Sequence, residues 1–558
     1  MASIQKKRIK GRLYYYAVQT ARVDGKPRVV WQKYLGKAED IVRRLEAGTT
    51  EPSFARITSF GAVAALYDLA RRLELVETIN RHAPKRRQGV GVGEYMLLAA
   101  VNRVLAPASK TQLAAWYERT ALTHLLRVRP EQITSQRFWD HMSYLDEDCI
   151  TRIEAELSAR MVRDFNLDLH CLVYDTTNFV TYIDSASPGT LAKRGHSKAR
   201  RGDLKQVNLA LMVTLDAHIP LFHQVYPGNV TDGTQFFTIT ADLVRRYRAF
   251  QEHCRDVTLI YDKGNNAREN QTGIDESPYH FVGSLAPSHH RDLLAIPLAD
   301  YVDLKPPFAG EKALRTTKRV MGVERTVVVT YNESLFAGQI QGLSQHLTRA
   351  VRGLGELRRN LTKPRRGRKP SPATVEKRIR EILSAQHMKT ILKAEVDFDV
   401  QPPALNYHTD QDALHGLTST LFGKGILFTG RDDWSNEQIV AAYRGQSQVE
   451  AAFRQMKDAH FVSWEPMFHW TDQKIRVHAF YCVLALTLSS LLQREVARQG
   501  ITLSADRLLK TLDDIHEVAA VYPDSAKRKD AIVLSERNRE QQQLFDLLGL
   551  GRYTIASR

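Results

Sequence analysis

The stretch WSNEQIVAAYRGQSQVEAAFRQMK, Trp434–Lys457, is the segment around which we expect this chain to be organised. Ser435 followed three residues later by Gln438 is typical of a capping box at the start of a helix. No proline interrupts the segment, and a helix tolerates a single internal glycine such as Gly445. The sequence therefore predicts one helix through the whole stretch.

Two rows of side chains run along this predicted helix. One row recurs at three- and four-residue steps and predicts packing against a core; it comprises Val449, Ala452, Phe453 and Met456. The other recurs at steps of three, four and seven, and comprises Tyr443, Gln446, Glu450 and Lys457. This second row is either a solvated stripe or one side of a site centred on the Glu450 carboxylate.

The composition points to a multidomain protein with a polyanionic partner. A chain of 558 residues is long enough for about three or four domains. Its 79 Lys and Arg against 62 Asp and Glu give a net charge of +17, which favours nucleic acid or an anionic membrane surface. The longest apolar run, Ala479–Leu492, is short for a membrane span and predicts a buried helix, so we expect no membrane partner.

The N-terminus and the cysteines indicate where the protein resides. The first residues are basic but lack the apolar run of a signal peptide. Four widely spaced cysteines without a CxxC pair predict buried thiols in a reducing compartment. We therefore expect a cytoplasmic protein.

The first 165 residues divide into two expected regions. In residues 1–50, a hairpin is predicted over residues 12–35 with its turn at Asp24–Gly25. Its many basic and aromatic residues suit DNA backbone contact, and a small structural β unit explains them equally well. Residues 51–165 carry mostly helical signals, which fit a DNA-binding region or a helical packing domain.

Two short apolar runs in the following region end in the same way. The run from Cys171 ends in Tyr174 and Asp175, and the run from Val257 ends in Tyr261 and Asp262. Each predicts a buried strand that ends in a carboxylate. Strands alternate with helices here, including a helix expected over residues 232–250, so residues 166–285 predict an α/β sheet.

The α/β rhythm is lost between residues 286 and 424, which predicts an inserted domain. Strand character returns at Gly425, so residues 425–500 are expected to complete the α/β domain. Residues 501–558 predict a charged, helical C-terminal tail.

Three carboxylates from these segments can meet at one point. Asp175 and Asp262 are expected at neighbouring strand ends, and Glu450 on a helix packed against them. Carboxylates held together repel each other unless a cation joins them, and hard oxygen ligands suit Mg²⁺ or Mn²⁺. A pair of such ions ~4 Å apart supports phosphodiester hydrolysis and transfer. The alternative is that the two aspartates merely cap loops.

These residues match a known family. The chain resembles the bacterial insertion-sequence transposases that carry a DDE triad and a Tyr-Arg-Glu-Lys signature. The matching segments are Val173–Asp184, Gly195–Leu209, Tyr226–Asp232 with Ile260–Asn270, and Ile439–Lys457. The resemblance implies an α/β fold with a ribonuclease-H-like catalytic core, interrupted by an insertion before the last acidic residue. It also implies that Asp175, Asp262 and Glu450 bind two Mg²⁺ or Mn²⁺ ions.

The signature residues lie on the predicted central helix. Tyr443, Glu450 and Lys457 match their family counterparts, and Gln446 stands at the arginine position. The resemblance implies DNA phosphate contacts for the tyrosine and the arginine. Glutamine donates hydrogen bonds without a charge, so a charge-assisted contact is lost there. Arg444 and Arg454 are the nearby candidates to replace it.

Four further residues belong to the matched segments. His196 and Lys205 fall in a basic stretch and are either DNA contacts or solvated charges. Asn229 and Asp232 match the family pattern and are expected either to support the site or to form a loop turn.

The resemblance predicts a transposase that binds the inverted ends of its own element, cleaves them and joins the 3′-hydroxyls to target DNA. We expect at least a homodimer on DNA, in a bacterial cytoplasm at the nucleoid. Two alternatives are a ribonuclease-H-like nuclease that cuts without joining, and a DNA-binding transposase relic without catalysis.

Overall fold

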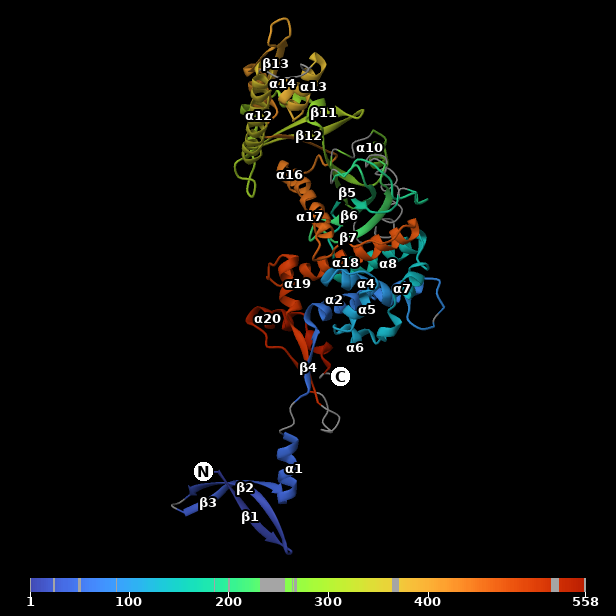
Figure 1. Ribbon diagram of the computed structural model, residues 1–558, viewed down its shortest axis with the longest axis vertical. Helices are drawn as coiled ribbons and strands as arrows, with labels where there is room; N and C mark the ends of the chain where they lie inside the picture. The colour runs from blue at the N-terminus through green and yellow to red at the C-terminus, as the bar shows by residue number, and fades with distance from the viewer. Residues whose placement is uncertain are drawn as a thin grey trace. The chain divides into compact units, whose positions relative to one another are not determined.

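In a computed structural model of the protein, the chain divides into two compact units (Figure 1). The first comprises Met1–Arg71, Lys110–Phe138 and Glu495–Arg558, and the second Arg72–Ser109 and Trp139–Arg494. The structure describes residues 2–23, 26–48, 52–86, 88–184, 186–198, 201–230, 256–262, 264, 268–363, 371–522 and 531–555. The helix expected over 232–250 and the turn at Asp24–Gly25 lie outside these residues.

A nine-stranded mixed sheet organises the second unit. Its strand order is β10-β11-β12-β15-β9-β8-β5-β6-β7. The strands are β5 (Cys171–Thr181), β6 (Lys205–Thr214), β7 (Pro220–Pro227), β8 (Thr258–Tyr261), β9 (His280–Ser284), β10 (Val302–Asp303), β11 (Glu311–Val320), β12 (Val323–Asn332) and β15 (Lys424–Thr429). β5, β6 and β7 form an antiparallel meander, and β8 and β9 continue parallel to β5. This mixed α/β arrangement confirms the expected ribonuclease-H-like core.

The central strands are apolar because the sheet buries them. All four residues of β8 are buried, and so are nine of the ten residues of β6. A strand covered on both faces has no polar alternation, which is why these segments appear in the sequence as continuous apolar runs.

The inserted domain begins later than the sequence predicted. Residues 302–332, within the expected insertion of 286–424, form strands of the main sheet, and β12 pairs directly with β15. A separate core, which includes Leu354, Met388 and Ile391, belongs to the segment that follows. Its elements are α12 (Glu333–Thr362), α13 (Pro372–Ile382), α14 (Met388–Ile391), β13 (Leu392–Asp397), β14 (Ala404–Thr409) and α15 (Gln411–Thr420).

The expected central helix is two helices, α16 (Asn436–Arg444) and α17 (Gln446–Lys457). The capping box of Ser435 and Gln438 is present at its start, as predicted. The prediction of an uninterrupted helix was wrong at Gly445. A Cβ atom there would lie 1.9 Å from Cδ1 of Leu215, so the glycine permits a close approach at the break.

Helix α18 (Asp472–Arg498) confirms the predicted buried apolar helix. By length and composition it could cross a membrane, but 94% of its most apolar window is buried inside the fold. The region expected to be helical also forms helices; they are α2 (Gly61–Arg72), α3 (Leu75–His82), α4 (Val92–Leu105), α5 (Leu113–Tyr117), α6 (Leu122–Leu126), α7 (Ser135–Met142) and α8 (Glu147–Phe165).

The first unit contains two small sheets. The predicted hairpin is present as β2 (Arg12–Val23) and β3 (Lys26–Gly36), and β1 (Ala2–Ile9) adds a third strand, followed by α1 (Ala38–Gly48). The C-terminal tail is not wholly helical as expected. Between α19 (Ala505–Asp513) and α20 (Arg539–Leu547) it contributes β16 (His516–Val521) and β17 (Ala531–Leu534), and β16 pairs with β4 (Phe54–Ser59). That pairing joins distant segments, which local sequence patterns do not report.

Candidate functional site

Asp175 and Asp262 occupy equivalent positions on neighbouring parallel strands. The pairing of β5 with β8 sets Val173 opposite Ile260. Each aspartate lies two residues beyond its member of that pair. Adjacent strands are about 4.8 Å apart, so this register brings the two acidic positions close to each other. Asp262 follows the end of β8, as predicted. The prediction that the other strand also ends at its carboxylate was wrong: β5 continues past Asp175 to Thr181 because it pairs with β6 along this length.

Two hydroxyl groups hold the Asp262 carboxylate. Oδ1 of Asp262 accepts hydrogen bonds of 3.1 Å from the Tyr443 hydroxyl and 3.1 Å from Ser284 Oγ. Ser284 ends β9, and Tyr443 comes from α16. Burial raises the pKa of Tyr443 well above its ordinary value, and the negative charges of Asp262 and Glu450 raise it further. The phenol therefore stays protonated as a donor, within electrostatic range of both carboxylates.

Lys457 lies on the other side of the site, beside β5. Its Nζ donates a hydrogen bond of 2.6 Å to Thr177 Oγ1 and lies 5.5 Å from the centre of the Phe179 ring. Burial lowers the pKa of Lys457, the nearby Lys198 lowers it further, and Asp175 opposes the shift. The Asp175 carboxylate thus favours the charged form of Lys457, whereas burial and Lys198 disfavour it.

Helices α16 and α17 consequently contact both aspartate-bearing segments, the middle of β5 and the residue after β8. Tyr443 contacts the β8 side, Lys457 contacts the β5 side, and α17 packs against β5. Glu450 lies between them in sequence, two helical turns before Lys457, and its side chain is exposed.

The acidic side chains at this site are of the chemical type that binds a hard divalent cation. Carboxylate oxygens are the ligands that Mg²⁺ and Mn²⁺ prefer, and Asp175 and Asp262 supply them from adjacent strands. Within the described residues, no group of three or more His, Cys, Asp or Glu side chains is close enough together to hold an ion. The structure therefore brings two acidic positions together and leaves the third, Glu450, on the neighbouring helix.

The expected DNA-contacting residues around Glu450 differ in their surroundings. Arg444 forms an ion pair with Glu311, and its guanidinium lies 4.8 Å from the centre of the Phe308 ring. Arg454 is exposed on α17. Nε2 of Gln446 is buried and has no hydrogen-bond partner in the described part of the chain. Arg444 is thus committed to a structural contact, whereas Arg454 and Gln446 are not.

The basic segment is tied to the sheet through its backbone. The carbonyl of His196 accepts hydrogen bonds of 3.1 Å from Asn178 Nδ2 and 3.1 Å from Gln206 Nε2. Nζ of Lys205 donates a hydrogen bond of 2.8 Å to the carbonyl of Asp184. These contacts place His196 and Lys205 beside β5 and β6.

The two expected supporting residues follow β7. Asn229 is exposed, and Asp232 lies outside the described residues. The adjacent Gly228 approaches Gly195 closely, since a Cβ atom on Gly195 would lie 2.0 Å from the Gly228 carbonyl oxygen. The loop after β7 therefore lies against the basic segment.

Sequence reasoning did not single out three residues that touch the site. Thr177 receives the Lys457 hydrogen bond; strand alternation could have identified it, since residues 175, 177 and 179 share one face of β5. Lys198 donates a hydrogen bond of 2.5 Å to the Thr176 carbonyl, and Ser284 holds Asp262. Lys198 belongs to the basic stretch and to the matched segment Gly195–Leu209, which was its only sequence signal, and Ser284 had none.

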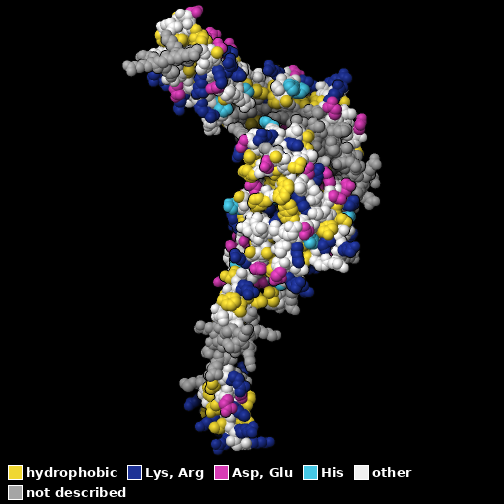
Figure 2. Space-filling model, turned by 45° about the vertical axis from the view of Figure 1, so that its right-hand side comes forward, with side chains coloured by type: hydrophobic (Ala, Val, Ile, Leu, Met, Phe, Trp, Pro, Cys, Tyr) yellow, Lys and Arg dark blue, Asp and Glu magenta, His cyan; other side chains and the backbone are white. Residues whose placement is uncertain are grey.

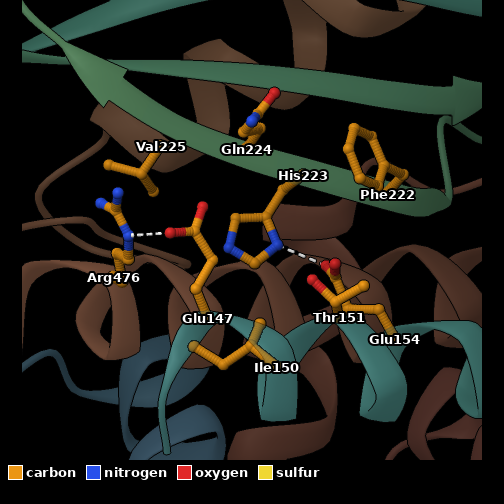
Figure 3. Close-up of a pocket in the computed structure, with 9 residues that line it drawn as sticks. All are labelled: Glu147, Ile150, Thr151, Glu154, Phe222, His223, Gln224, Val225 and Arg476. Atoms are coloured by element: carbon orange, nitrogen blue, oxygen red, sulfur yellow. Dashed lines mark hydrogen bonds and ion pairs between the residues drawn. The ribbon is translucent and has the colours of Figure 1, made fainter. Parts of the chain in front are cut away.

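A separate pocket lies between α8, β7 and α18, with its lining residues drawn in Figure 3. His223 and Glu154, whose side chains are 4% and 8% exposed, are joined there by a short hydrogen bond from Nδ1 to Oε1. Nε of Arg476 donates a hydrogen bond of 2.8 Å to Glu147. Both contacts fasten α8 to its neighbours and lie on elements other than those that carry the acidic residues.

The chain is similar to solved structures of transposases. Two similar solved structures are the piggyBac transposase synaptic complex with hairpin DNA and the Mos1 transposase paired-end complex with the left transposon end. The first has 10% identity and a TM-score of 0.36, covering 83% of this chain and 82% of that one. The second has 14% identity and a TM-score of 0.16, and the match covers 38% of this chain and 62% of the Mos1 chain.

Sequence families give a firmer result. No curated protein matches the chain. The family model described as "Transposase DDE domain" matches residues 171–488, which is more than half of the chain and runs from the start of β5 into α18. The protein therefore belongs to the family of transposases with a DDE domain.

Proposed function

We propose that this protein is the transposase of a bacterial insertion sequence. In this proposal it binds the inverted ends of its own element, cleaves the DNA there, and transfers the freed 3′-hydroxyls to target DNA. The observation that supports it best is the register of β5 and β8, in which Asp175 and Asp262 each follow the paired residues Val173 and Ile260 by two positions.

Asp175, Asp262 and Glu450 are the proposed ligands of two Mg²⁺ or Mn²⁺ ions. Such ions, when bound, activate a water or a 3′-hydroxyl and stabilise the departing oxygen. The chain itself orients the carboxylates: Tyr443 and Ser284 fix Asp262, and Lys457 lies near Asp175. Because Glu450 is exposed on α17, we propose that it completes the ligand set from that helix.

The signature residues are proposed to hold the DNA backbone. The Lys457 ammonium has three N–H groups, so it can donate to a phosphate oxygen as well as to Thr177. The single proton of the Tyr443 hydroxyl is donated to Asp262, so its proposed phosphate contact requires the hydroxyl to turn from that carboxylate to the DNA. Gln446 occupies the arginine position of the Tyr-Arg-Glu-Lys signature with a buried amide nitrogen. Arg454, His196 and Lys205 are further proposed phosphate contacts, whereas the ion pair of Arg444 with Glu311 favours a structural role for that arginine.

Asn229 and Asp232 are proposed to support the site from the loop after β7. Pairing of two element ends requires at least two copies of the chain, so we propose a homodimer on DNA. The net charge of +17 supports residence at the nucleoid of the bacterial cytoplasm.

The test is a strand-transfer reaction with the purified protein, Mg²⁺, a duplex copied from the inverted repeats that flank the gene, and a target plasmid. Joined products on a denaturing gel are expected. Cut ends without joined products would instead identify a nuclease. Absence of both products across a Mg²⁺ and Mn²⁺ titration, with end binding intact, would identify a non-catalytic relic.

A further inference from the structure

The N-terminal sheet has one face on which basic and large apolar side chains share the surface. In an antiparallel sheet, directly opposed residues project to the same side. The register opposes Lys6 to Tyr15, Arg8 to Leu13, Ala17 to Lys33 and Gln19 to Trp31. We call this side the basic face; it comprises Lys6, Arg8, Leu13, Tyr15, Trp31 and Lys33.

Side chains of the basic face are turned to solvent. Leu13 is 41% exposed and Trp31 49%, and the three charged members are exposed as well. In the described chain, no hydrogen bond or ion pair engages the side chains of Lys6, Arg8 or Lys33. Figure 2 shows Lys and Arg side chains interspersed with hydrophobic ones on the N-terminal lobe.

Internal packing of the sheet lies on its other side. Val18 is 1% exposed there, and the Tyr34 ring contacts Tyr14 at 6.0 Å and Tyr16 at 5.3 Å between centroids. Since the opposite side supplies the buried contacts, the exposed apolar groups of the basic face do not serve as the core of this sheet.

Charge identifies the kind of occupant. Residues 1–36 contain nine Lys or Arg and a single acidic residue, Asp24. The partner must therefore be polyanionic. Three strand axes span about 10 Å, which is comparable with the roughly 12 Å width of the major groove of duplex DNA. Side chains on alternate positions of such a surface can reach both phosphates and base edges.

We propose that the basic face binds duplex DNA in the major groove, with Lys6, Arg8 and Lys33 on phosphates and Trp31 against base edges. This inference rests on the proposed function in one respect: the duplex that the basic face binds is taken to be the end of the element. It assigns end recognition to a surface outside the 171–488 segment that carries the acidic residues.

The first test measures binding of fluorescein-labelled duplexes to the full chain over a series of salt concentrations. The duplexes are the inverted repeat and a scrambled sequence. The variant Lys6→Ala/Arg8→Ala/Lys33→Ala is expected to lower the slope of log affinity against log salt by about 2 to 3, because each lost phosphate contact lowers it by ~0.9.

A matched control removes the same charge from the other face. Lys7 of β1 lies opposite Tyr14 of β2. Arg12 and Arg22 are separated from Tyr14 by even numbers of positions along β2. All three basic residues therefore belong to the side of Val18. Lys7→Ala/Arg12→Ala/Arg22→Ala is expected to change the slope by less than about 1. Equal losses in the two variants, with unchanged melting by circular dichroism, would overturn the proposal.

Groove choice is tested by methylation protection. Guanine N7 lies in the major groove, so the unmodified protein should protect it and the basic-face variant should not. Protection of adenine N3 in the minor groove alone would overturn the proposal. The proposal would also be overturned if the protein bound phosphatidylserine vesicles more tightly than DNA and only the basic-face variant lost that binding. That result would identify a membrane partner.

Cleavage of the end duplex by the unmodified protein reports separately on the proposed function. If guanine protection depends on the basic face and no cleavage occurs in Mg²⁺, only the proposed catalysis fails. If cleavage and joining occur and both triple variants bind alike, only the present inference fails.

Discussion

The Tyr443 hydroxyl lies 3.1 Å from Oδ1 of Asp262, although the two residues are 181 positions apart in the chain. Asp262 follows β8, before the inserted domain, and Tyr443 belongs to α16, after it. This hydrogen bond joins the two halves of the core at the proposed site. It gives a fixed orientation to a carboxylate that follows a strand of only four residues.

Replacing Tyr443 by Phe removes that hydrogen bond and preserves the ring. We expect the Mg²⁺-dependent cleavage rate to fall about tenfold, since a hydrogen bond to a charged group contributes roughly 1.5 kcal/mol. The measurement is the single-turnover rate on the end duplex. Tyr144→Phe, at an exposed tyrosine, is the control and should keep the parent rate. A parent-like rate for Tyr443→Phe would remove the orienting role.

Because of Lys457, we expect the affinity for end DNA to fall at a lower alkaline pH than an ordinary lysine would cause. Burial lowers its pKa below the ordinary value of about 10.4, so Lys457 loses its charge at a lower pH than a solvated lysine does. We expect the affinity for end DNA to weaken on this alkaline limb. Lys457→Arg, whose guanidinium stays charged, should move the limb to higher pH. Identical pH profiles for the two proteins would contradict the assignment.

Gln446 offers a gain-of-function test. Its buried amide nitrogen lacks a hydrogen-bond partner in the described structure and carries no charge. Gln446→Arg should tighten end binding or speed strand transfer by about tenfold, as expected for one added charge-assisted contact. Ser447→Arg adds the same charge one residue away, on an exposed position, and should have a smaller effect. Equal effects of the two substitutions would show that position 446 has no special role.

The His223 and Glu154 pair should contribute to stability and not to chemistry. Both side chains are almost fully buried, so His223→Leu leaves a carboxylate without its imidazole partner. We expect a loss of about 3 kcal/mol in the free energy of unfolding, measured by urea denaturation. The double variant His223→Leu/Glu154→Leu should recover much of this loss. A larger loss in the double variant would contradict the explanation.

Local signals in the sequence predicted the parts of the site that depend on one segment at a time. The runs ending in Tyr174–Asp175 and Tyr261–Asp262 are strands because both faces of the sheet are covered. Ser435 and Gln438 form the predicted capping box because it needs only three-residue spacing. Asp262 therefore follows its strand as predicted, whereas Asp175 lies within β5, which pairing with β6 extends to Thr181.

The remaining features depend on contacts between distant segments. The break at Gly445 arises beside Leu215, which precedes it by more than 200 residues. β12 joins the main sheet by pairing with β15 across the whole inserted domain. β16 is a strand because β4, from the other end of the chain, pairs with it. No periodicity within one segment carries such information.

The most direct test of the central claim is Mg²⁺-dependent cleavage of the end duplex by Asp175→Asn, Asp262→Asn and Glu450→Gln, each compared with Glu356→Gln at an exposed position of α12. We predict that each of the first three lowers the rate by roughly a thousandfold or more while end binding persists, and that Glu356→Gln cleaves like the parent. A parent-like cleavage rate in any one of the three would contradict the proposal that these carboxylates act together on divalent ions.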